Sequence, residues 1–315
     1  MKILSRKRKK DESTPQRADL RRRHLEGLAE LERADPASPA FAEPDTAALP
    51  PGPGLPEFGA GELTPGLLRA AILRDGCALV RGLVPRDDAL EFADEIDRAF
   101  EERERSIDGQ QYDLEYYDPF HPEPPQELDL ASQAWVREGG GLFAPDSPVV
   151  AARMFELLDE AGVTALIDGY LGQRPLISSQ KTTLRKSAPD VSGAWHQDGR
   201  FLGGVRAMNL WLALSRCGDE APGLDIVPKR FDEMVPSGTD DAPLWYCVSD
   251  AVIAEVSADA PVIRPIFEPG DAMFFDDLFL HKTGSDPSMP NSRFALECWH
   301  FGATGFPGDY APIAA

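Results

Sequence analysis

The segment WHQDG at residues 195–199 places a histidine and an aspartate two positions apart, at His196 and Asp198. On an extended chain, residues i and i+2 point to the same face, so both side chains can hold one ion. A later segment, PGDAMFF at 269–275, reads as a turn followed by a strand, and His281 comes shortly after it. A fold that lays this strand beside the earlier segment would bring the three side chains together as a metal site.

The second half of the chain reads as β-rich around these segments. After residue 172, short apolar runs alternate with turn signals, and the expected strands are 176–184, 207–214, 224–227, 251–256, 262–267, 272–275 and 294–301. Earlier residues have apolar positions at helical spacing, which predicts helices opening at Thr64-Pro65, at Pro85 and at Ser147-Pro148, the last one continuing to about Leu171. Helices first and strands later predict an α+β chain, a β-sandwich or small barrel with helices on one side.

The first 56 residues have a different character. Residues 1–25 hold ten basic and three acidic side chains, and residues 36–56 hold seven prolines. Proline at that density excludes a helix or a central strand. We therefore expect 1–56 to be a basic, Pro-rich and flexible arm, helical at most from Arg17 to Leu31, and 57–315 to be a single domain.

The composition limits the possible functions. The 315-residue chain has a formal net charge of −21, so its body repels nucleic acid and anionic membranes. No apolar run reaches the roughly 18 residues of a membrane span, and no apolar segment follows the basic start, so we expect a cytoplasmic protein. The cysteines lie far apart without a CxxC pair, which predicts free thiols rather than disulfides or a zinc site; they are Cys77, Cys217, Cys247 and Cys298.

The residue types of the triad favour iron. Two imidazoles and one carboxylate leave three coordination positions open, as in iron(II) oxygenases that bind a chelating co-substrate and then dioxygen. Arg293 comes twelve residues after His281, and a hairpin between them would place its guanidinium near the metal. A guanidinium can hold a carboxylate with two parallel hydrogen bonds. Thr283 would add a hydroxyl on the same side, so the segment predicts a pocket for a dicarboxylate.

Several segments together resemble the phytanoyl-CoA dioxygenase family, from about residue 76 to residue 302. They are WHQDG (195–199), NLWLAL (209–214), GLDIVPKR (223–230), PGDAMFF (269–275), HKTG (281–284) and SRFALECWHF (292–301). The resemblance implies a mostly β core, a double-stranded β-helix (jelly roll, cupin-like), with flanking N-terminal helices. It also implies an oxidoreductase that uses Fe(II), 2-oxoglutarate and O2.

The same resemblance implies roles for individual residues. His196, Asp198 and His281 would bind the iron. The 2-oxoglutarate pocket would be formed by Arg293, Thr283, Trp211 and Thr183, although Trp211 is equally compatible with a core position. Asp198 favours hydroxylation, because halogenating members of the wider superfamily have a small residue there.

Other side chains are candidates for substrate contact. Arg200 and Phe201 directly follow the metal-binding segment, where they would line the substrate entrance, although an arginine at such a position is more often a surface residue. Glu297 shares strand phase with Arg293, so it is either a substrate contact or the ion-pair partner of that arginine. The aromatic loop 112–120 is either a lid over the site or a long surface excursion, and we favour the lid. Of the remaining histidines, His24 and His121 are expected to be solvated and His300 to be structural.

These observations together predict a dioxygenase that hydroxylates an unactivated carbon of a small molecule and releases succinate and carbon dioxide. Two alternatives stay open. A jelly-roll isomerase or hydrolase with another metal would keep the triad without needing Arg293, and a non-catalytic binding protein would need neither. We expect no nucleic-acid and no membrane partner, and the acidic body favours a neutral or cationic substrate over a polyanionic CoA ester.

Overall fold

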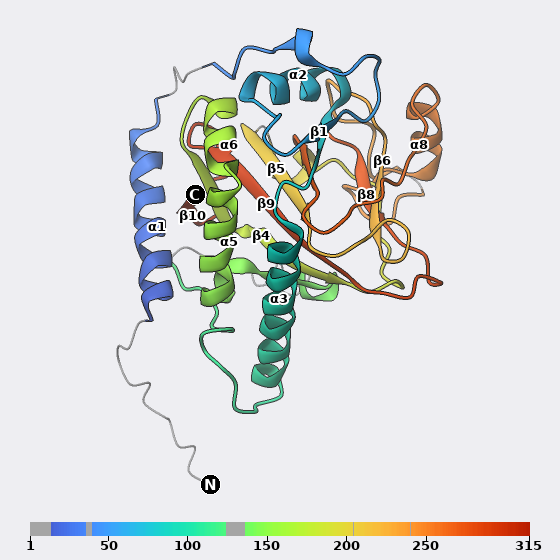
Figure 1. Cartoon of the computed structure of the whole chain (residues 1–315). Helices are drawn as coiled ribbons and strands as arrows, with labels where there is room; N and C mark the ends of the chain where they lie inside the picture. Colours follow the sequence, from blue (N-terminus) through green and yellow to red (C-terminus); the bar gives the residue numbers. More distant parts are fainter. Residues whose placement is uncertain (1–13, 36–39, 124–135, 204, 240) are drawn as a thin grey trace.

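The computed structural model describes residues 14–35, 40–123, 136–203, 205–239 and 241–315 (Figure 1). Its longer helices are α1 (Pro15–Arg33), α2 (Pro65–Asp75), α3 (Arg86–Ile107), α5 (Pro148–Glu160), α6 (Val163–Leu171) and α8 (Asp250–Val256). Shorter ones are η1 (Thr46–Ala48), η2 (Ala144–Asp146) and α7 (Gly199–Leu202). The run of basic residues at 6–10 lies outside the described residues.

Two sheets form the β core. The larger, eight-stranded sheet has the order β1-β2-β7-β5-β9-β4-β10, with β3 also paired to β4. Its strands are β1 (Glu57–Gly59), β2 (Cys77–Arg81), β3 (Gly141–Phe143), β4 (Pro175–Ser187), β5 (Ala207–Ala213), β7 (Ala272–Phe275), β9 (Arg293–Gly302) and β10 (Pro312–Ala314). The smaller sheet pairs β6 (Gly223–Ile226) with β8 (His281–Gly284). Together they form the jelly-roll core that the sequence predicted, with β1 at the start of the predicted domain.

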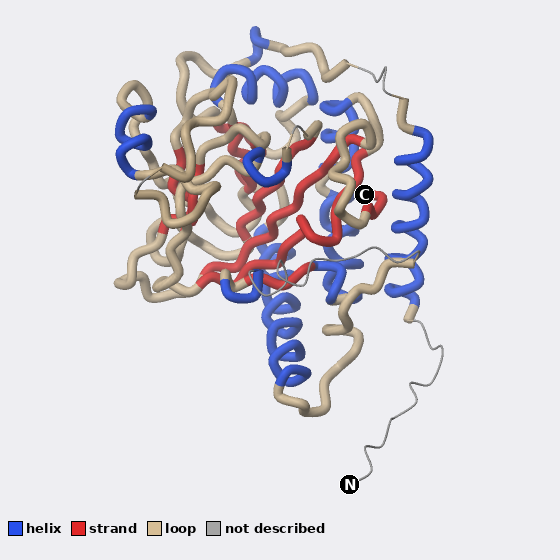
Figure 2. Tube along the Cα trace, turned by 180° about the vertical axis from the view of Figure 1, so that it is seen from behind, coloured by secondary structure: helices blue, strands red, loops and turns tan. Residues whose placement is uncertain are grey.

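The large sheet separates two packed layers. Figures 1 and 2 show α1, α5 and α6 on one side of the sheet and β6, β8 and α8 beyond its other side. Alternation along β5 explains the division, because Met208, Leu210 and Leu212 pack with the helices while Trp211 and Ala213 pack in the interior between the sheets. This interior is where the candidate site lies.

Helix boundaries follow capping chemistry. Thr64 accepts a hydrogen bond from the backbone of Leu67 and precedes Pro65, as the sequence predicted, and Gly76 ends α2 in the left-handed conformation. The single helix expected from residue 148 to about 171 is wrong. Gly162, with φ of +70°, divides it into α5 and α6, because a left-handed residue cannot continue a helix.

Two of the expected strands are also wrong. Residues 251–256 belong to α8, whose N-terminus is capped by the Ser249 side chain accepting from Val252. Residues 262–267 form no named strand and contribute only isolated bridges at Ile263 and Phe267. In both cases apolar and β-branched content predicted strand where local capping or tertiary context decided otherwise.

The N-terminal helix is docked on the body. α1 packs against α5 and β10, and Arg23 donates to the carbonyl of Ala314. The expectation that His24 is solvated is wrong: it is 1% exposed, and its Nδ1 lies 2.7 Å from the carbonyl oxygen of Pro312. The helix predicted from Arg17 to Leu31 therefore exists, and it covers an edge of the sheet. The boundary between an arm and a domain near residue 56 stays a prediction.

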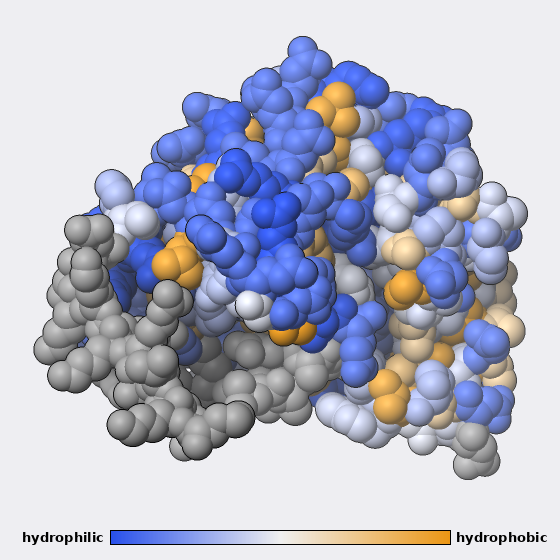
Figure 3. All heavy atoms as spheres, turned by 90° about the horizontal axis from the view of Figure 1, so that it is seen from below, coloured by the Kyte–Doolittle hydropathy of each residue, from blue (hydrophilic) through white to orange (hydrophobic). Residues whose placement is uncertain are grey.

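The face of the molecule seen from below is largely polar, with apolar side chains in small groups (Figure 3). Within the described ranges, no helix is both long and apolar enough to cross a membrane. All four cysteines are buried free thiols, as predicted.

Candidate active site

Three ligand types meet at one point of the interior. His196, Asp198 and His281 each offer an atom within 4.8 Å of the others. Nε2 of His196 lies 3.7 Å from one carboxylate oxygen of Asp198, and Nε2 of His281 lies 3.8 Å from the other. The triad predicted from the sequence is therefore brought together in space.

Backbone pairing sets the positions of the two histidines. The amide of His196 donates to the carbonyl of His281 at 3.0 Å, and the amide of His281 donates back at 3.2 Å. The side chain of Gln197 fixes the loop between the ligands, because it donates to Leu278 O and accepts from Val235 N. A reciprocal bridge and a buried amide thus hold the ligand-bearing segments in register.

Asp198 reaches the site differently from the expectation. It is not in extended conformation but in the right-handed helical region, where it begins α7. The amide of Gly199 donates to the carbonyl of Asp277 at 2.9 Å and so anchors this turn to the segment after β7. The sequence predicted an extended conformation for residues 196 to 198. This prediction therefore identified the right ligand but assumed the wrong backbone conformation.

The hydrogen bonds of the triad suit a metal ion. Nδ1 of His196 donates to Ala194 O at 2.8 Å, and Nδ1 of His281 donates to Phe279 O at 3.1 Å. A carbonyl can only accept, so the protons sit on Nδ1 and both Nε2 atoms present lone pairs. Burial and the neighbouring His196 lower the pKa of His281, which favours the neutral form. One buried oxygen of Asp198 has no hydrogen-bond partner in the described structure, so its lone pairs can serve as a metal ligand.

The triad lines a cavity of about 430 Å³ between the two sheets, a size typical of small-molecule sites. Arg293 lines the same cavity, as expected, but the predicted hairpin between His281 and Arg293 is wrong. His281 begins β8 of the small sheet, whereas Arg293 begins β9 of the large sheet. The chain crosses between the sheets, and both residues line the cavity from different sheets.

Arg293 is 2% exposed. Its terminal nitrogens donate to Gly223 O at 3.1 Å and to Ser187 Oγ at 2.8 Å, while its Nε has no partner in the described structure. The guanidinium carbon lies 5.3 Å from the centre of the Trp211 ring. Burial lowers the pKa of Arg293 to about 10, so the group is still a cation at neutral pH.

The structure places most other predicted residues at the cavity. Thr283, Thr183, Trp211 and Phe201 all line it. Phe201 also stacks on His196, with ring centres 6.2 Å apart. Arg200 does not line it: this side chain is exposed, and its Nε donates to Ser237 Oγ at 2.6 Å.

Glu297 lines the cavity, but Arg293 is not its partner. Arg185 donates to its carboxylate at 2.9 Å and 3.2 Å. The two residues meet because Thr183 is directly opposite Glu297 in the β4–β9 pairing, and Arg185 follows on the same face. Burial by itself would raise the pKa of Glu297, but Arg185 and then Lys181 lower it to about 2.

Among the polar residues of the cavity that the sequence did not single out are Lys181 and Asn209. Lys181 lies two positions before Thr183, and Asn209 lies two positions before Trp211, both of which were predicted pocket residues. Strand alternation is a signal that could have found them, because residues i and i+2 share a face.

The expected lid does not cover the site. Residues 112–120 contribute nothing to the cavity lining. Instead, Tyr116 packs under Arg98 of α3, and Phe120 is buried against His24 and donates to Asp146. The aromatic residues of this loop therefore serve the helical layer. By contrast, His300 is buried and its Nδ1 donates a hydrogen bond to the carbonyl oxygen of Cys298. This agrees with the structural role predicted for it.

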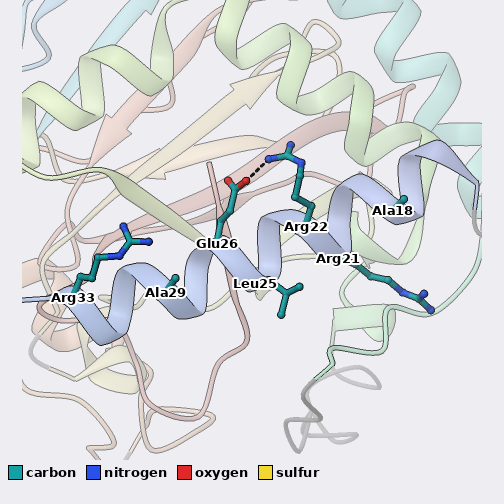
Figure 4. A pocket seen from close by; sticks show the side chains of 7 residues that line it. All are labelled: Ala18, Arg21, Arg22, Leu25, Glu26, Ala29 and Arg33. Atoms are coloured by element: carbon teal, nitrogen blue, oxygen red, sulfur yellow. Dashed lines mark hydrogen bonds and ion pairs between the residues drawn. The ribbon is translucent and has the colours of Figure 1, made fainter.

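A second hollow lies on the outer face of α1 and has a volume of about 510 Å³. Its lining comes from one helix alone: Ala18, Arg21, Arg22, Leu25, Glu26, Ala29 and Arg33 (Figure 4). The Arg22–Glu26 pair there is a helix-surface ion pair. The hollow has no converging ligands, so the cavity between the sheets is the candidate active site.

Comparison with protein families identifies the chain. Residues 72–293 match the model of the phytanoyl-CoA dioxygenase (PhyH) family. The chain belongs to this family. The matched range contains the triad and ends at Arg293, in agreement with the resemblance seen in the sequence. A comparison with curated protein sequences found no match.

Solved structures are similar to the chain at low sequence identity. EctD from S. alaskensis, determined with 2-oxoglutarate and 5-hydroxyectoine, is 14% identical with a TM-score of 0.52, covering 83% of both chains. The epimerase SnoN, in complex with Fe3+, alpha ketoglutarate and nogalamycin RO, is 16% identical with a TM-score of 0.47, covering 74% of this chain and 82% of its own. The carbocyclase SnoK is 14% identical with a TM-score of 0.49, covering 79% and 87%. The EctD comparison confirms the jelly-roll fold.

Proposed function

We propose that this family member is an iron(II)- and 2-oxoglutarate-dependent oxygenase that hydroxylates an unactivated carbon of a small molecule. The observation that carries the proposal is the triad, whose two Nε2 atoms and unpartnered Asp198 oxygen converge on a cavity that also holds Arg293. When bound, iron with 2-oxoglutarate and dioxygen supplies an oxidation that yields succinate, carbon dioxide and the hydroxylated product. The dioxygenase chemistry that gives the family its name supports the same assignment.

Arg293 separates this proposal from a metal-dependent isomerase or hydrolase. Buried charges in proteins are normally paired, yet the described partners of Arg293 are a carbonyl and a hydroxyl, both neutral. Those two bonds orient the guanidinium and leave its charge for a ligand carboxylate. The distal carboxylate of 2-oxoglutarate fits this position, and Thr283 can donate a further hydrogen bond.

The test is an anaerobic titration of metal-free protein with iron(II) and then 2-oxoglutarate, followed by the visible absorbance of their chelate. We expect the band in the wild type, none in His281→Ala, and a much higher 2-oxoglutarate requirement in Arg293→Ala. His121→Ala and Arg21→Ala are matched controls, because both side chains are exposed and lie outside the cavity.

Each outcome assigns a role. A wild-type band that both active-site variants alter and both controls retain establishes the cofactor, the co-substrate and their residues. A wild type that binds iron but shows no band would overturn the proposal. A band unchanged in Arg293→Ala would leave iron in place and remove 2-oxoglutarate from the position assigned to it.

A further inference from the structure

The inner face of the large sheet carries polar side chains in rows across β4, β9 and β5. Ser187 lies opposite Arg293, and further along, Thr183 and Trp211 both lie opposite Glu297. Asn209 lies opposite Trp299 in the next row. Residues directly opposite in a sheet share a face, so one wall of the cavity carries polar side chains at both of its ends, among apolar ones such as Trp211 and Trp299.

The two ends of this wall are well separated. The row of Asn209, at Trp299, lies six residue steps along β9 from the row of Arg293, which at the rise of a strand is roughly 20 Å. Lys181 belongs to the Asn209 end, since it comes two positions before Thr183. Phe275, the partner of Asn209 on β7, contacts the His281 ring, with ring centres 4.8 Å apart. The Asn209 end therefore borders the triad on the side away from Arg293.

Lys181 is a cation without an ion-pair partner among the described residues at that end. Its Nζ has no hydrogen bond or salt bridge to any residue that the structure describes, and it lies 4.1 Å from the centre of the Phe201 ring. Burial lowers the pKa of Lys181, while the more distant Asp198 and Glu297 act against that shift. Glu297 is already bonded to Arg185, and Asp198 is assigned to the metal.

Asn209 is an amide without a partner beside it. The side chain is 1% exposed and lines the cavity, yet neither its oxygen nor its nitrogen has a hydrogen-bond partner in the described structure. A buried amide left in this state destabilises the fold. Both a hydrogen-bond donor and an acceptor thus point toward the space next to the triad.

The charges of the cavity leave room for one anion. Its interior carries the cations Lys181, Arg185 and Arg293 and the carboxylates Asp198 and Glu297, whereas Glu138 is exposed at the rim. A divalent iron and the dianion of 2-oxoglutarate cancel each other. One positive charge is left over, and Lys181 is the cation that neither Glu297 nor the co-substrate uses.

We propose that the substrate is a monoanionic organic acid whose carboxylate pairs with Lys181 at the end of the cavity opposite Arg293. An amide or hydroxyl group next to that carboxylate bonds to Asn209. The apolar remainder lies against Phe201 and Tyr246, whose rings meet edge to face with centres 5.7 Å apart. This inference rests on the proposed function, because it assigns Arg293 to 2-oxoglutarate and leaves Lys181 for the substrate.

The experiment measures binding next to the metal. Protein loaded with Mn(II) and 2-oxoglutarate under nitrogen is mixed with hippurate, 3-phenylpropionate or N-acetylleucine, each compared with its primary amide. Paramagnetic relaxation of the ligand protons by Mn(II) reports only molecules that bind beside the site. We expect at least one acid to bind at least tenfold more tightly than its amide. Asn209→Ala is expected to weaken hippurate and N-acetylleucine more than 3-phenylpropionate, which has no amide group.

Variants at Lys181 give the decisive readout. Lys181→Met is expected to abolish the preference for acid over amide, and Lys181→Arg to restore part of it. Lys186→Met is the matched control, since Lys186 is on the same strand but pairs with Asp97 outside the cavity. The iron–2-oxoglutarate absorbance of Lys181→Met is measured in parallel and is expected to match the wild type.

The outcomes separate this inference from the proposed function. A wild type that forms the chelate but binds no acid, or binds acids and amides equally, overturns the inference and leaves the oxygenase assignment standing. A Lys181→Met variant that loses affinity for 2-oxoglutarate also overturns it, because Lys181 would then serve the co-substrate. Absence of the chelate in the wild type would remove the foundation of both.

Discussion

Replacing Asn209 with leucine tests whether the unpartnered amide is held in the fold for ligand binding. The side chain is 1% exposed, and in the described structure its two polar atoms have no partner. Removing an unpaired buried amide returns about 1–3 kcal/mol. Leucine has the same branching, and the adjoining cavity gives room for its larger methyl groups. We therefore expect Asn209→Leu to raise the free energy of unfolding by about 1–3 kcal/mol, while weakening ligand binding.

Urea unfolding of the metal-free protein, followed by circular dichroism, measures this change, and the melting temperature should rise by roughly 2–6 °C. Asn291→Leu is the control, because Asn291 is exposed and its replacement should change stability by less than about 0.5 kcal/mol. Equal or lower stability of Asn209→Leu would refute the reasoning. It would mean that the Asn209 amide is hydrogen-bonded in the folded protein and does not lower its stability.

Three further predictions concern the co-substrate, pH and a turn. Arg293→Lys keeps the positive charge but loses the two parallel N–H donors of the guanidinium. The chelate titration should therefore show at least a tenfold weaker 2-oxoglutarate affinity, about 1.4 kcal/mol; an unchanged affinity would contradict the role of Arg293. Burial raises the pKa of Asp146 from 3.8 to about 7. The contribution of Asp146 to stability is therefore fully present below pH 4 and is lost as pH rises through 7. Urea unfolding at pH 8 should find Asp146→Asn more stable than wild type, by at most about 4 kcal/mol; equal stability at pH 8 would show that the carboxylate titrates normally. Gly270→Ala should lower the melting temperature far more than Gly52→Ala. Both glycines have positive φ, but a Cβ at Gly270 would lie 2.0 Å from Val84 O, whereas a Cβ at Gly52 would have no atom within 4 Å. Equal effects of the two substitutions would refute the clash.

Short motifs with their own chemistry were the most predictable part of this chain. The turn at residues 269–271 holds because Asp271 accepts from the backbone of Gly82 and from Arg81, which ties β7 to β2. His196 and His281 could be paired from residue type alone, since few combinations of side chains suit a metal. What spacing could not give was the path of the chain between sheets, so the hairpin joining His281 to Arg293 was wrong although Arg293 was placed correctly at the cavity.

Other errors arose where apolar content was read without its neighbours. Residues 251–256 are rich in β-branched residues, but Ser249 and Asp250 supply a helix cap and first turn that decide for α8. The aromatic loop at 112–120 was read as a lid because of its composition, whereas its packing against α3 and His24 depends on the docking of α1. Long-range packing of that kind has no local signature.

The charge of the whole chain and the charge of the cavity have opposite signs, and this difference affects which substrates can bind. The net charge of −21 suggested a neutral or cationic substrate, but the cavity interior is cationic around Lys181, Arg185 and Arg293. Repulsion by exposed carboxylates is screened over about 8 Å at physiological ionic strength and grows with the charge of the ligand. On the proposed assignment, the surface disfavours polyanions such as CoA esters, while a small monoanion is weakly repelled outside and paired inside. The surface and the cavity together would then favour a substrate that carries a single negative charge.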